Sequence, residues 1–165
     1  MTWEALAAAS RLAPQMQRQA TERQPAPADG QGAADRKGIA MKKDLVLVAE
    51  DDRDIRELLT IALESAGYQT VGARDGRTAA RILANAQPVG LITDVRMPDM
   101  NGIDLCRLVR STPEINNTAV LMYSAGVHQY DVEAGLHAGA DRYLPKPVSP
   151  RRLIAELCDV IASRH

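Results

Sequence analysis

Short aliphatic runs alternate along the chain with stretches in which apolar residues recur every three or four positions. The aliphatic runs are Leu45–Ala49, Thr70–Ala73, Gly90–Thr93, Ala119–Tyr123 and Arg142–Leu144. Continuous apolar runs of this kind are typical of strands that are covered on both faces of a parallel sheet. The pattern therefore predicts a strand at each run.

Amphipathic helices are predicted between these strands. Their apolar positions are, in chain order, Ile55, Leu58, Leu59, Ala62 and Ala66, then Ala79, Ile82, Leu83 and Ala86, then Leu105, Leu108 and Val109, and last Leu153, Leu157, Val160 and Ile161. Start and stop signals frame the helices, because Asp75 and Ser149 are good N-cap residues, Pro150 suits a first helical position and Gly67 suits a helix end.

A further helix is expected over residues 129–138, where Gly135 makes the pattern least regular. Strands that alternate with helices in this way predict an α/β fold, a doubly wound five-stranded parallel sheet with right-handed crossovers and helices on both faces. Such sheets bind ligands at the carboxyl ends of their strands, where the strand order reverses. We expect the functional site at that edge.

The first forty residues have a different composition. Residues 21–38 are rich in Pro, Gly, Ala and charge and offer almost nothing to bury. We therefore expect residues 1–40 to be a largely disordered N-terminal extension, and residues 41–165 to be the folded domain. Trp3 and Leu6 could form the apolar stripe of one short helix, and two alternatives stay open for it: no function, or docking onto the domain or a partner.

Composition excludes several classes of protein. Aromatic residues make up only 3% of the chain and Phe is absent, so the core must be aliphatic. A net charge of −1 argues against a general binder of nucleic acid or membrane surfaces. The chain has neither an apolar stretch that could cross a membrane nor a signal-peptide pattern. Cys106 and Cys158 are expected to be reduced, half-buried thiols, and the location is expected to be cytoplasmic.

Acidic residues directly follow two of the predicted strands. Glu50, Asp51 and Asp52 come after the first strand, and Asp94 comes after the third. Carboxylates crowded at a strand end repel one another unless a cation, a helix N-terminus or a ligand offsets them, and a buried one is costly without a partner. Asp51 or Asp52 could also serve simply as a helix cap, and that alternative stays open.

A hydroxyl and an ammonium group are predicted at the same edge, because Ser124 ends the fourth strand and Lys146 follows the fifth. Taken singly, they would be a turn hydroxyl and a solvated charge. Together with the carboxylates they suit Mg²⁺, which prefers oxygen ligands, and phosphoryl transfer, in which a carboxylate can be the nucleophile and a cation neutralises the transferring group. No His or Cys follows these strands directly, so zinc is disfavoured.

Four stretches of the chain resemble the receiver domain of bacterial two-component response regulators. They are "VLVAEDDRDIRELL", "LITDVRMPDMNGIDLCRLVR", "VLMYSA" and "AGADRYLPKPV", and the resemblance covers about residues 43–163. It implies a flavodoxin-like fold with strand order 2-1-3-4-5. It also implies that Asp94 accepts a phosphoryl group from the phosphohistidine of a sensor histidine kinase or a histidine phosphotransfer protein.

The resemblance implies a magnesium site. Glu50 and Asp51 would hold Mg²⁺ together with Asp94 and the backbone carbonyl of Arg96, while Asp52 would cap the first helix. Glu50 departs from the family's commoner Asp and should still bind the metal. Arg96 places a bulky cation two residues beyond Asp94, where its side chain could reach the phosphate or an incoming water molecule.

The resemblance also implies a switch. Ser124 matches the switch hydroxyl, where Thr is commoner, and Tyr143 matches the switch aromatic. Lys146 matches the lysine that binds the phosphate, and its peptide bond to Pro147 is expected to be cis. After phosphorylation, Ser124 would move towards Asp94 and Tyr143 would turn inward to fill the vacated space.

Taken together, these features predict a stand-alone receiver domain rather than an enzyme. The pattern ends directly after the fifth helix, so we expect the output to be phosphorylation-dependent binding to an unknown protein, onward phosphotransfer or a phosphate sink, with no direct contact to nucleic acid or membrane. A phosphohydrolase of the haloacid dehalogenase type is disfavoured, because Arg96 stands where its second Asp would fall. A receiver-like domain that binds constitutively is disfavoured because every chemical position is filled.

Overall fold

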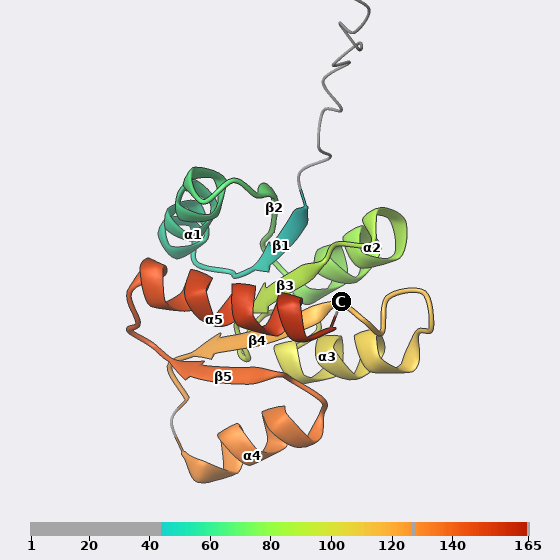
Figure 1. The fold of residues 1–165 in the computed structure, drawn as a ribbon. Helices are drawn as coiled ribbons and strands as arrows, with labels where there is room; N and C mark the ends of the chain where they lie inside the picture. Colours follow the sequence, from blue (N-terminus) through green and yellow to red (C-terminus); the bar gives the residue numbers. More distant parts are fainter. Residues whose placement is uncertain (1–43, 127, 165) are drawn as a thin grey trace, which may run out of the picture. The chain divides into compact units, whose positions relative to one another are not determined.

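The computed structural model describes residues 44–126 and 128–164 of the chain (Figure 1). The extension expected over residues 1–40 lies outside these residues, and the domain limits of 41–165 stay a prediction. No helix in the described ranges is both long enough and apolar enough to span a bilayer.

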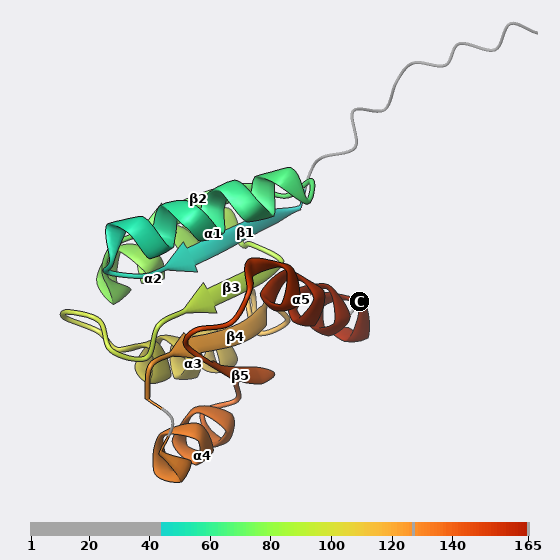
Figure 2. The ribbon, with the colours of Figure 1, turned by 90° about the vertical axis from the view of Figure 1, so that its left-hand side faces the viewer.

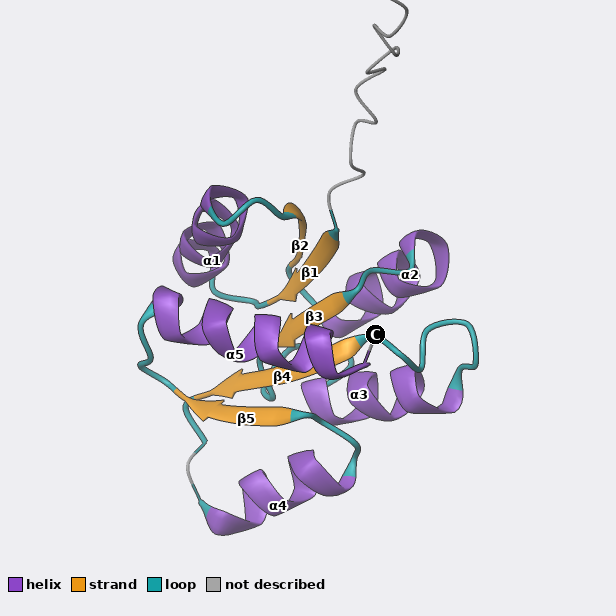
Figure 3. Cartoon of the chain, in the orientation of Figure 1, coloured by secondary structure: helices purple, strands orange, loops and turns teal. Residues whose placement is uncertain are grey.

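Strands and helices alternate in the described ranges as the hydrophobic pattern predicts (Figure 3). The elements are β1 (Leu45–Ala49), α1 (Arg53–Ser65), β2 (Gln69–Ala73), α2 (Gly76–Ala86), β3 (Gly90–Thr93), α3 (Gly102–Ser111), β4 (Ala119–Ser124), α4 (Gln129–His137), β5 (Arg142–Pro145) and α5 (Pro150–Arg164). The predicted strands are confirmed with shifts of one residue, at the start of β2 and at the ends of β4 and β5.

The strands form one parallel sheet in the order β2-β1-β3-β4-β5. In the register, Leu47 pairs with Val71 on one side and with Leu91 on the other. The chain therefore turns from β1 to β2 in one direction and returns to β3 in the other. This reversal leaves the carboxyl ends of β1 and β3 side by side, at the position where doubly wound sheets bind their ligands.

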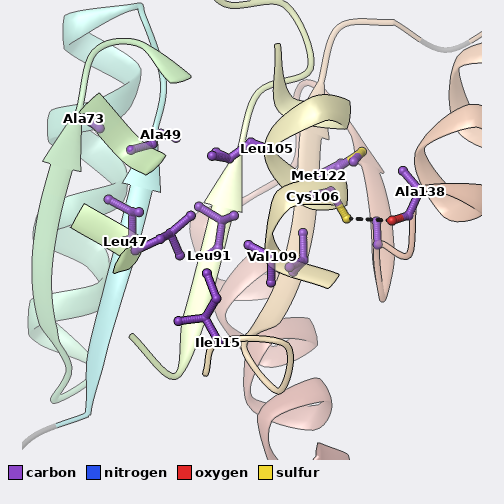
Figure 4. Packing of buried hydrophobic residues seen from close by; sticks show 14 of the residues in the cluster. Leu47, Ala49, Ala73, Leu91, Leu105, Cys106, Val109, Ile115, Met122 and Ala138 are labelled. Carbon is purple, nitrogen blue, oxygen red and sulfur yellow. Dashed lines mark hydrogen bonds between the residues drawn. The ribbon is translucent and has the colours of Figure 1, made fainter. Parts of the chain in front are cut away.

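The core consists of two apolar layers, one on each face of the sheet. On one face, Leu47 and Leu91 pack with Leu105 and Val109 of α3 and with residues of α2 (Figure 4). On the other face, strand residues pack with Leu59 of α1 and with residues of α5. Figures 1 and 2 show the helices on the two sides of the sheet. The core is aliphatic, as the composition predicts.

Side chains cap the helices where the sequence has cap residues. Asp52 accepts hydrogen bonds from the backbone nitrogens of the first turn of α1, and Asp75 and Asn101 cap α2 and α3 in the same way. The Ser149 hydroxyl accepts a bond from the Arg152 nitrogen at the start of α5. Asp52 is thus the capping acid of α1, while the Asp51 carboxylate accepts a bond from the Asp52 nitrogen.

Several expectations about side chains need correction. Leu58 is 54% exposed and Ala66 is also exposed, because the buried stripe of α1 is centred on Leu59 and Leu63 and only one flank of the predicted stripe faces the sheet. The two cysteines are not half-buried. Cys106 is buried in α3 with its thiol against the Ala138 carbonyl (Figure 4), and Cys158 lies exposed on α5.

Helix α4 runs without a break through Gly135, which is buried. A Cβ atom there would lie 2.6 Å from the sulfur of Met122 and 2.9 Å from a ring carbon of Tyr143. The glycine therefore lets the helix approach β4 and β5 closely, and this packing offsets its low helix propensity of about 1 kcal/mol relative to alanine.

Candidate functional site

The predicted acids meet at the carboxyl edge of the sheet. Glu50 and Asp51 follow β1, Asp94 follows β3, and one carboxylate oxygen from each lies within 4.8 Å of the others. Glu50 and Asp94 are only 2% and 8% exposed, whereas Asp51 is exposed. The buried carboxylates require compensation by positive charge.

Lys146 supplies that charge from the end of β5. Its ammonium nitrogen lies 2.7 Å from a carboxylate oxygen of Glu50 and 2.7 Å from one of Asp94. The Lys146 backbone nitrogen donates to the Ser124 carbonyl, and the peptide bond to Pro147 is cis, as expected. The ammonium thus bridges two acids that lie far apart in the sequence, at positions 50 and 94.

Ser124 and Tyr143 form a second group next to the carboxylates. Ser124 is fully buried, and its hydroxyl accepts a 3.4 Å bond from the Gly126 nitrogen. The Tyr143 hydroxyl donates to the Gly126 carbonyl at 2.6 Å. Gly126 therefore joins the two residues that the resemblance assigns to a switch.

The loop after Asp94 folds back on this residue. The backbone nitrogen of Arg96 donates to an Asp94 carboxylate oxygen at 3.2 Å, and Arg96 itself is exposed. The Thr93 hydroxyl donates to the Asp94 carbonyl at 2.9 Å. The structure thus places the residues that the sequence assigns to the site at one edge of the sheet, while their roles in metal binding, phosphorylation and switching stay predictions.

A family model described as the response regulator receiver domain matches residues 46–158. The chain belongs to this family. Receiver domains are signalling domains, in which an acidic pocket for Mg²⁺ and phosphorylation are typical. The resemblance inferred from the four sequence stretches is therefore confirmed.

Curated relatives of this receiver domain are longer proteins. The present chain is 39% identical over 112 residues to the response regulator MprA of Mycolicibacterium vanbaalenii. It is 36% identical over 112 residues to the DNA-binding response regulator MtrA of Mycobacterium tuberculosis. Each match covers 68% of this chain and 48% of the relative. The chain thus spans about half the length of the curated relatives it matches.

Solved structures show the same fold. The chemotaxis response regulator CheY4 of Vibrio cholerae matches with a TM-score of 0.67 and 31% identity, over 72% of this chain and 98% of that one. A putative response regulator from Chloroflexus aurantiacus matches with a TM-score of 0.70 and 33% identity, over 73% and 99%. The predicted flavodoxin-like strand order is confirmed.

Burial and ion pairing oppose each other at the receiver site. Burial is the main reason why the pKa of Glu50 is raised above its ordinary value, and the hydrogen bond from Lys146 only partly offsets it. For Lys146, burial by itself would lower the pKa, but the bonds to Asp94 and Glu50 outweigh it and raise the pKa of the ammonium. Lys146 is therefore charged at neutral pH, while Glu50 takes up a proton more readily than a solvated carboxyl.

Gly102 allows the loop of the receiver domain to close over Asp94. A Cβ atom at Gly102 would lie 2.1 Å from the Asp94 carbonyl oxygen, which is backbone and cannot rotate away. The Gly102 nitrogen also donates to the Val95 carbonyl. The first residue of α3 thus packs directly against the backbone of the candidate phosphoacceptor.

We expect Gly102→Ala to lower the free energy of unfolding by about 3 kcal/mol, because the added methyl group overpacks a backbone contact. Gly67→Ala is the matched control. Gly67 has a φ of +99° and no atom within 4 Å of the position that an added methyl group would take, so only backbone strain of about 1 kcal/mol is expected there. Urea unfolding of both variants measures the difference. Equal losses of unfolding free energy in the two variants would show that the contact of the added methyl group with the Asp94 carbonyl is not destabilising.

One residue at the site was missed by the sequence reasoning. Arg56, in the first turns of α1, donates from its guanidinium to the carbonyls of Glu50 and Asp51, at 2.6 and 3.2 Å. A cation close to a helix N-terminus is electrostatically unfavourable, and this was the signal in the sequence that could have drawn attention to it.

Proposed function

We propose that this receiver domain accepts a phosphoryl group on Asp94, in a Mg²⁺-dependent transfer from the phosphohistidine of a sensor histidine kinase or a histidine phosphotransfer protein. The observation that carries the proposal is the Lys146 ammonium, which lies 2.7 Å from both Glu50 and Asp94. It faces the position where the negative charge of a phosphoryl group on Asp94 would develop.

The donor set fits Mg²⁺. The three carboxylates offer oxygen atoms within 4.8 Å of one another, and two of these side chains are buried. Oxygen ligands at this spacing suit a small hard cation. Glu50, Asp51 and Asp94 would hold the ion, together with the Arg96 carbonyl. When bound, Mg²⁺ would neutralise charge on the transferring group.

The chain's own residues would perform the transfer. A carboxylate oxygen of Asp94 attacks the phosphorus, the bond between phosphorus and the imidazole nitrogen breaks, and the imidazole leaves with the electron pair. Lys146 stabilises the charge on the phosphoryl oxygens, while its contact with Glu50 holds the ammonium in place. The protein supplies position and charge, which is most of what phosphoryl transfer requires.

Incubation with acetyl phosphate and Mg²⁺ tests the proposal. We expect one stable phosphoryl group per chain, located on Asp94 by mass spectrometry of borohydride-reduced protein. Continuous turnover of acetyl phosphate would instead favour a phosphohydrolase. The absence of any labelling would favour a domain that binds constitutively.

We expect Asp51→Ala to weaken Mg²⁺ binding about tenfold or more, at least as much as the loss of an outer-shell partner in other metal sites. Asp51 is the exposed member of the carboxylate group, so its removal leaves the buried ion pairs of Lys146 intact. Calorimetric titration with Mg²⁺ measures the change. Asp52→Ala serves as a control that weakens the cap of α1, and an equal loss in both variants would return Asp51 to a structural role.

We further propose that the signal leaves through α4, β5 and α5, by phosphorylation-dependent binding to a protein or by onward phosphotransfer. Tyr143 already lies against Gly135 and bonds to Gly126. Phosphorylation would therefore favour this position of Tyr143, by drawing the Ser124 hydroxyl towards Asp94, rather than create it.

Relatives named DNA-binding response regulators suggest a second output, binding to DNA by a longer protein. Retention on DNA of such a longer protein, but not of the purified chain, would support that output.

We expect Ser124→Ala to accept phosphate on Asp94 but to lose the conformational response. In the wild-type protein, NMR shift changes on phosphorylation should extend from residues 94–97 into residues 124–146. In the variant they should stay near Asp94, because the hydroxyl that links the phosphate to Gly126 is missing. Wild-type changes confined to the neighbourhood of Asp94 would contradict the coupling.

A further inference from the structure

The backbone that precedes α1 is held by a side chain of the same helix. Arg56 folds back from α1, and one guanidinium nitrogen lies 2.6 Å from the Glu50 carbonyl oxygen and 3.2 Å from that of Asp51. The side chain is half-buried, whereas Arg53, one turn earlier, is exposed. Two consecutive carbonyls of the acidic loop therefore share one cationic donor.

A guanidinium close to the start of α1 is electrostatically unfavourable, so the hydrogen bonds of Arg56 must compensate for that cost. The N-terminal end of a helix carries a partial positive charge, which disfavours a nearby cation. Hydrogen bonds from a charged donor to carbonyl oxygens are worth about 1.5–3 kcal/mol, enough to offset that cost. The guanidinium is thus held at the loop by its bonds to the two carbonyls.

The bonds from Arg56 affect where the side chains of Glu50 and Asp51 point. The Glu50 nitrogen donates to the Ala73 carbonyl of β2 at 3.0 Å, while Arg56 holds the carbonyl of the same residue. Both backbone groups of Glu50 are therefore fixed, and the Glu50 carboxylate reaches Lys146. Arg56 holds the Asp51 carbonyl, and the exposed Asp51 carboxylate accepts a 3.1 Å bond from the Asp52 nitrogen. Its position therefore depends on the backbone on both sides of the carbonyl that Arg56 holds.

Gly72 provides the space that Arg56 needs. A Cβ atom at Gly72 would lie 3.1 Å from Cδ and 3.3 Å from Cγ of Arg56. The aliphatic part of the arginine therefore lies against β2, and a side chain at position 72 would require it to shift by a few tenths of an ångström. The position of Arg56 can thus be altered without removing its charge.

We propose that Arg56 is a positioning residue for the magnesium-binding carboxylates, which it orients through the backbone of Glu50 and Asp51. The inference rests on the proposed function, since it assumes that these acids bind Mg²⁺. Removing a cation close to a metal site should by itself strengthen Mg²⁺ binding, because the cation repels the ion. If Arg56 acts by position, its removal should weaken binding instead.

The test is the Mg²⁺ dissociation constant of the full chain, measured by calorimetry or from amide NMR shifts, with variants at three positions. Arg56→Gln is expected to weaken Mg²⁺ binding about tenfold, the lower range for outer-shell partners of metal ligands. Arg56→Lys, which keeps the charge but not the planar donor group, and Gly72→Ala, which keeps the arginine, should weaken it in the same direction. Arg53→Gln is the control for a charge one turn earlier in α1 and should leave the dissociation constant within about twofold.

Unchanged or tighter binding in Arg56→Gln would overturn the proposal, as would an equal loss in Arg53→Gln. If Arg56→Gln fails to fold, Arg56→Lys and Gly72→Ala decide. A lower melting temperature of the metal-free variant with unchanged Mg²⁺ affinity would show a merely structural role and would also overturn it. Absence of Mg²⁺ binding by the wild-type chain would contradict the proposed function itself, which separates the two failures.

Discussion

Replacing Asp94 with Asn is expected to abolish phosphorylation of the protein. The substitution removes the nucleophilic carboxylate and one ligand of the proposed magnesium site but keeps the size and shape of the side chain. Incubation with acetyl phosphate and Mg²⁺, followed by intact-mass measurement, should show no phosphorylated species in the variant and a single added phosphoryl group in the wild type.

The fold should survive this change. Lys146 keeps its 2.7 Å contact with Glu50. Removing one of three neighbouring carboxylates also lessens their mutual repulsion. We therefore expect a melting temperature no lower than that of the wild type. Asp99→Asn is the matched control, because Asp99 is an exposed acid in the loop after β3. Labelling of Asp94→Asn to the wild-type extent would disprove the assignment of the phosphoacceptor.

Replacing Lys146 with Met should have the second largest effect. We expect phosphorylation by acetyl phosphate to slow about 100-fold, the usual cost of removing one group that stabilises a developing anion. Metal-free protein should also lose about 3 kcal/mol of unfolding free energy, because Glu50 and Asp94 remain buried without their shared cation. Arg142→Met, at the other end of β5, is the control, since its pair with Glu156 is half-exposed.

The stability lost in Lys146→Met should depend on pH. Burial already raises the pKa of Glu50 above its ordinary 4.5 in the wild type, and loss of the ammonium raises it further. A carboxyl whose pKa is raised by folding favours the folded state below its unfolded pKa and loses that contribution as pH rises through the folded value. The unfolding free energy that Lys146→Met loses relative to the wild type should therefore be largest at neutral pH. This loss should shrink on acidification towards pH 4.5. A deficit that is the same at all pH values would show that packing, and not charge, is lost.

The sequence by itself determined the architecture and the location of the site. Apolar periodicity distinguished strands from helices, because a doubly covered strand and a one-sided helix bury different sets of positions. Cap residues such as Asp75 and Ser149 start their helices because local backbone bonds decide helix ends. Acids placed at the ends of parallel strands must share an edge of the sheet. These features depend on local or repeating geometry, so no knowledge of tertiary contacts was required.

Tertiary structure decided what depends on the distance between remote residues. It showed that Lys146 bridges Glu50 and Asp94, that α1 buries Leu59 and exposes Leu58, and that Arg56 holds the acidic loop. Pattern alone cannot supply these facts, since neighbouring helix positions differ in burial only when the packing partner is in place. Gly135 is the clearest case. The sequence suggests a weak helix there, whereas the close approach of Met122 and Tyr143 requires a residue without a side chain.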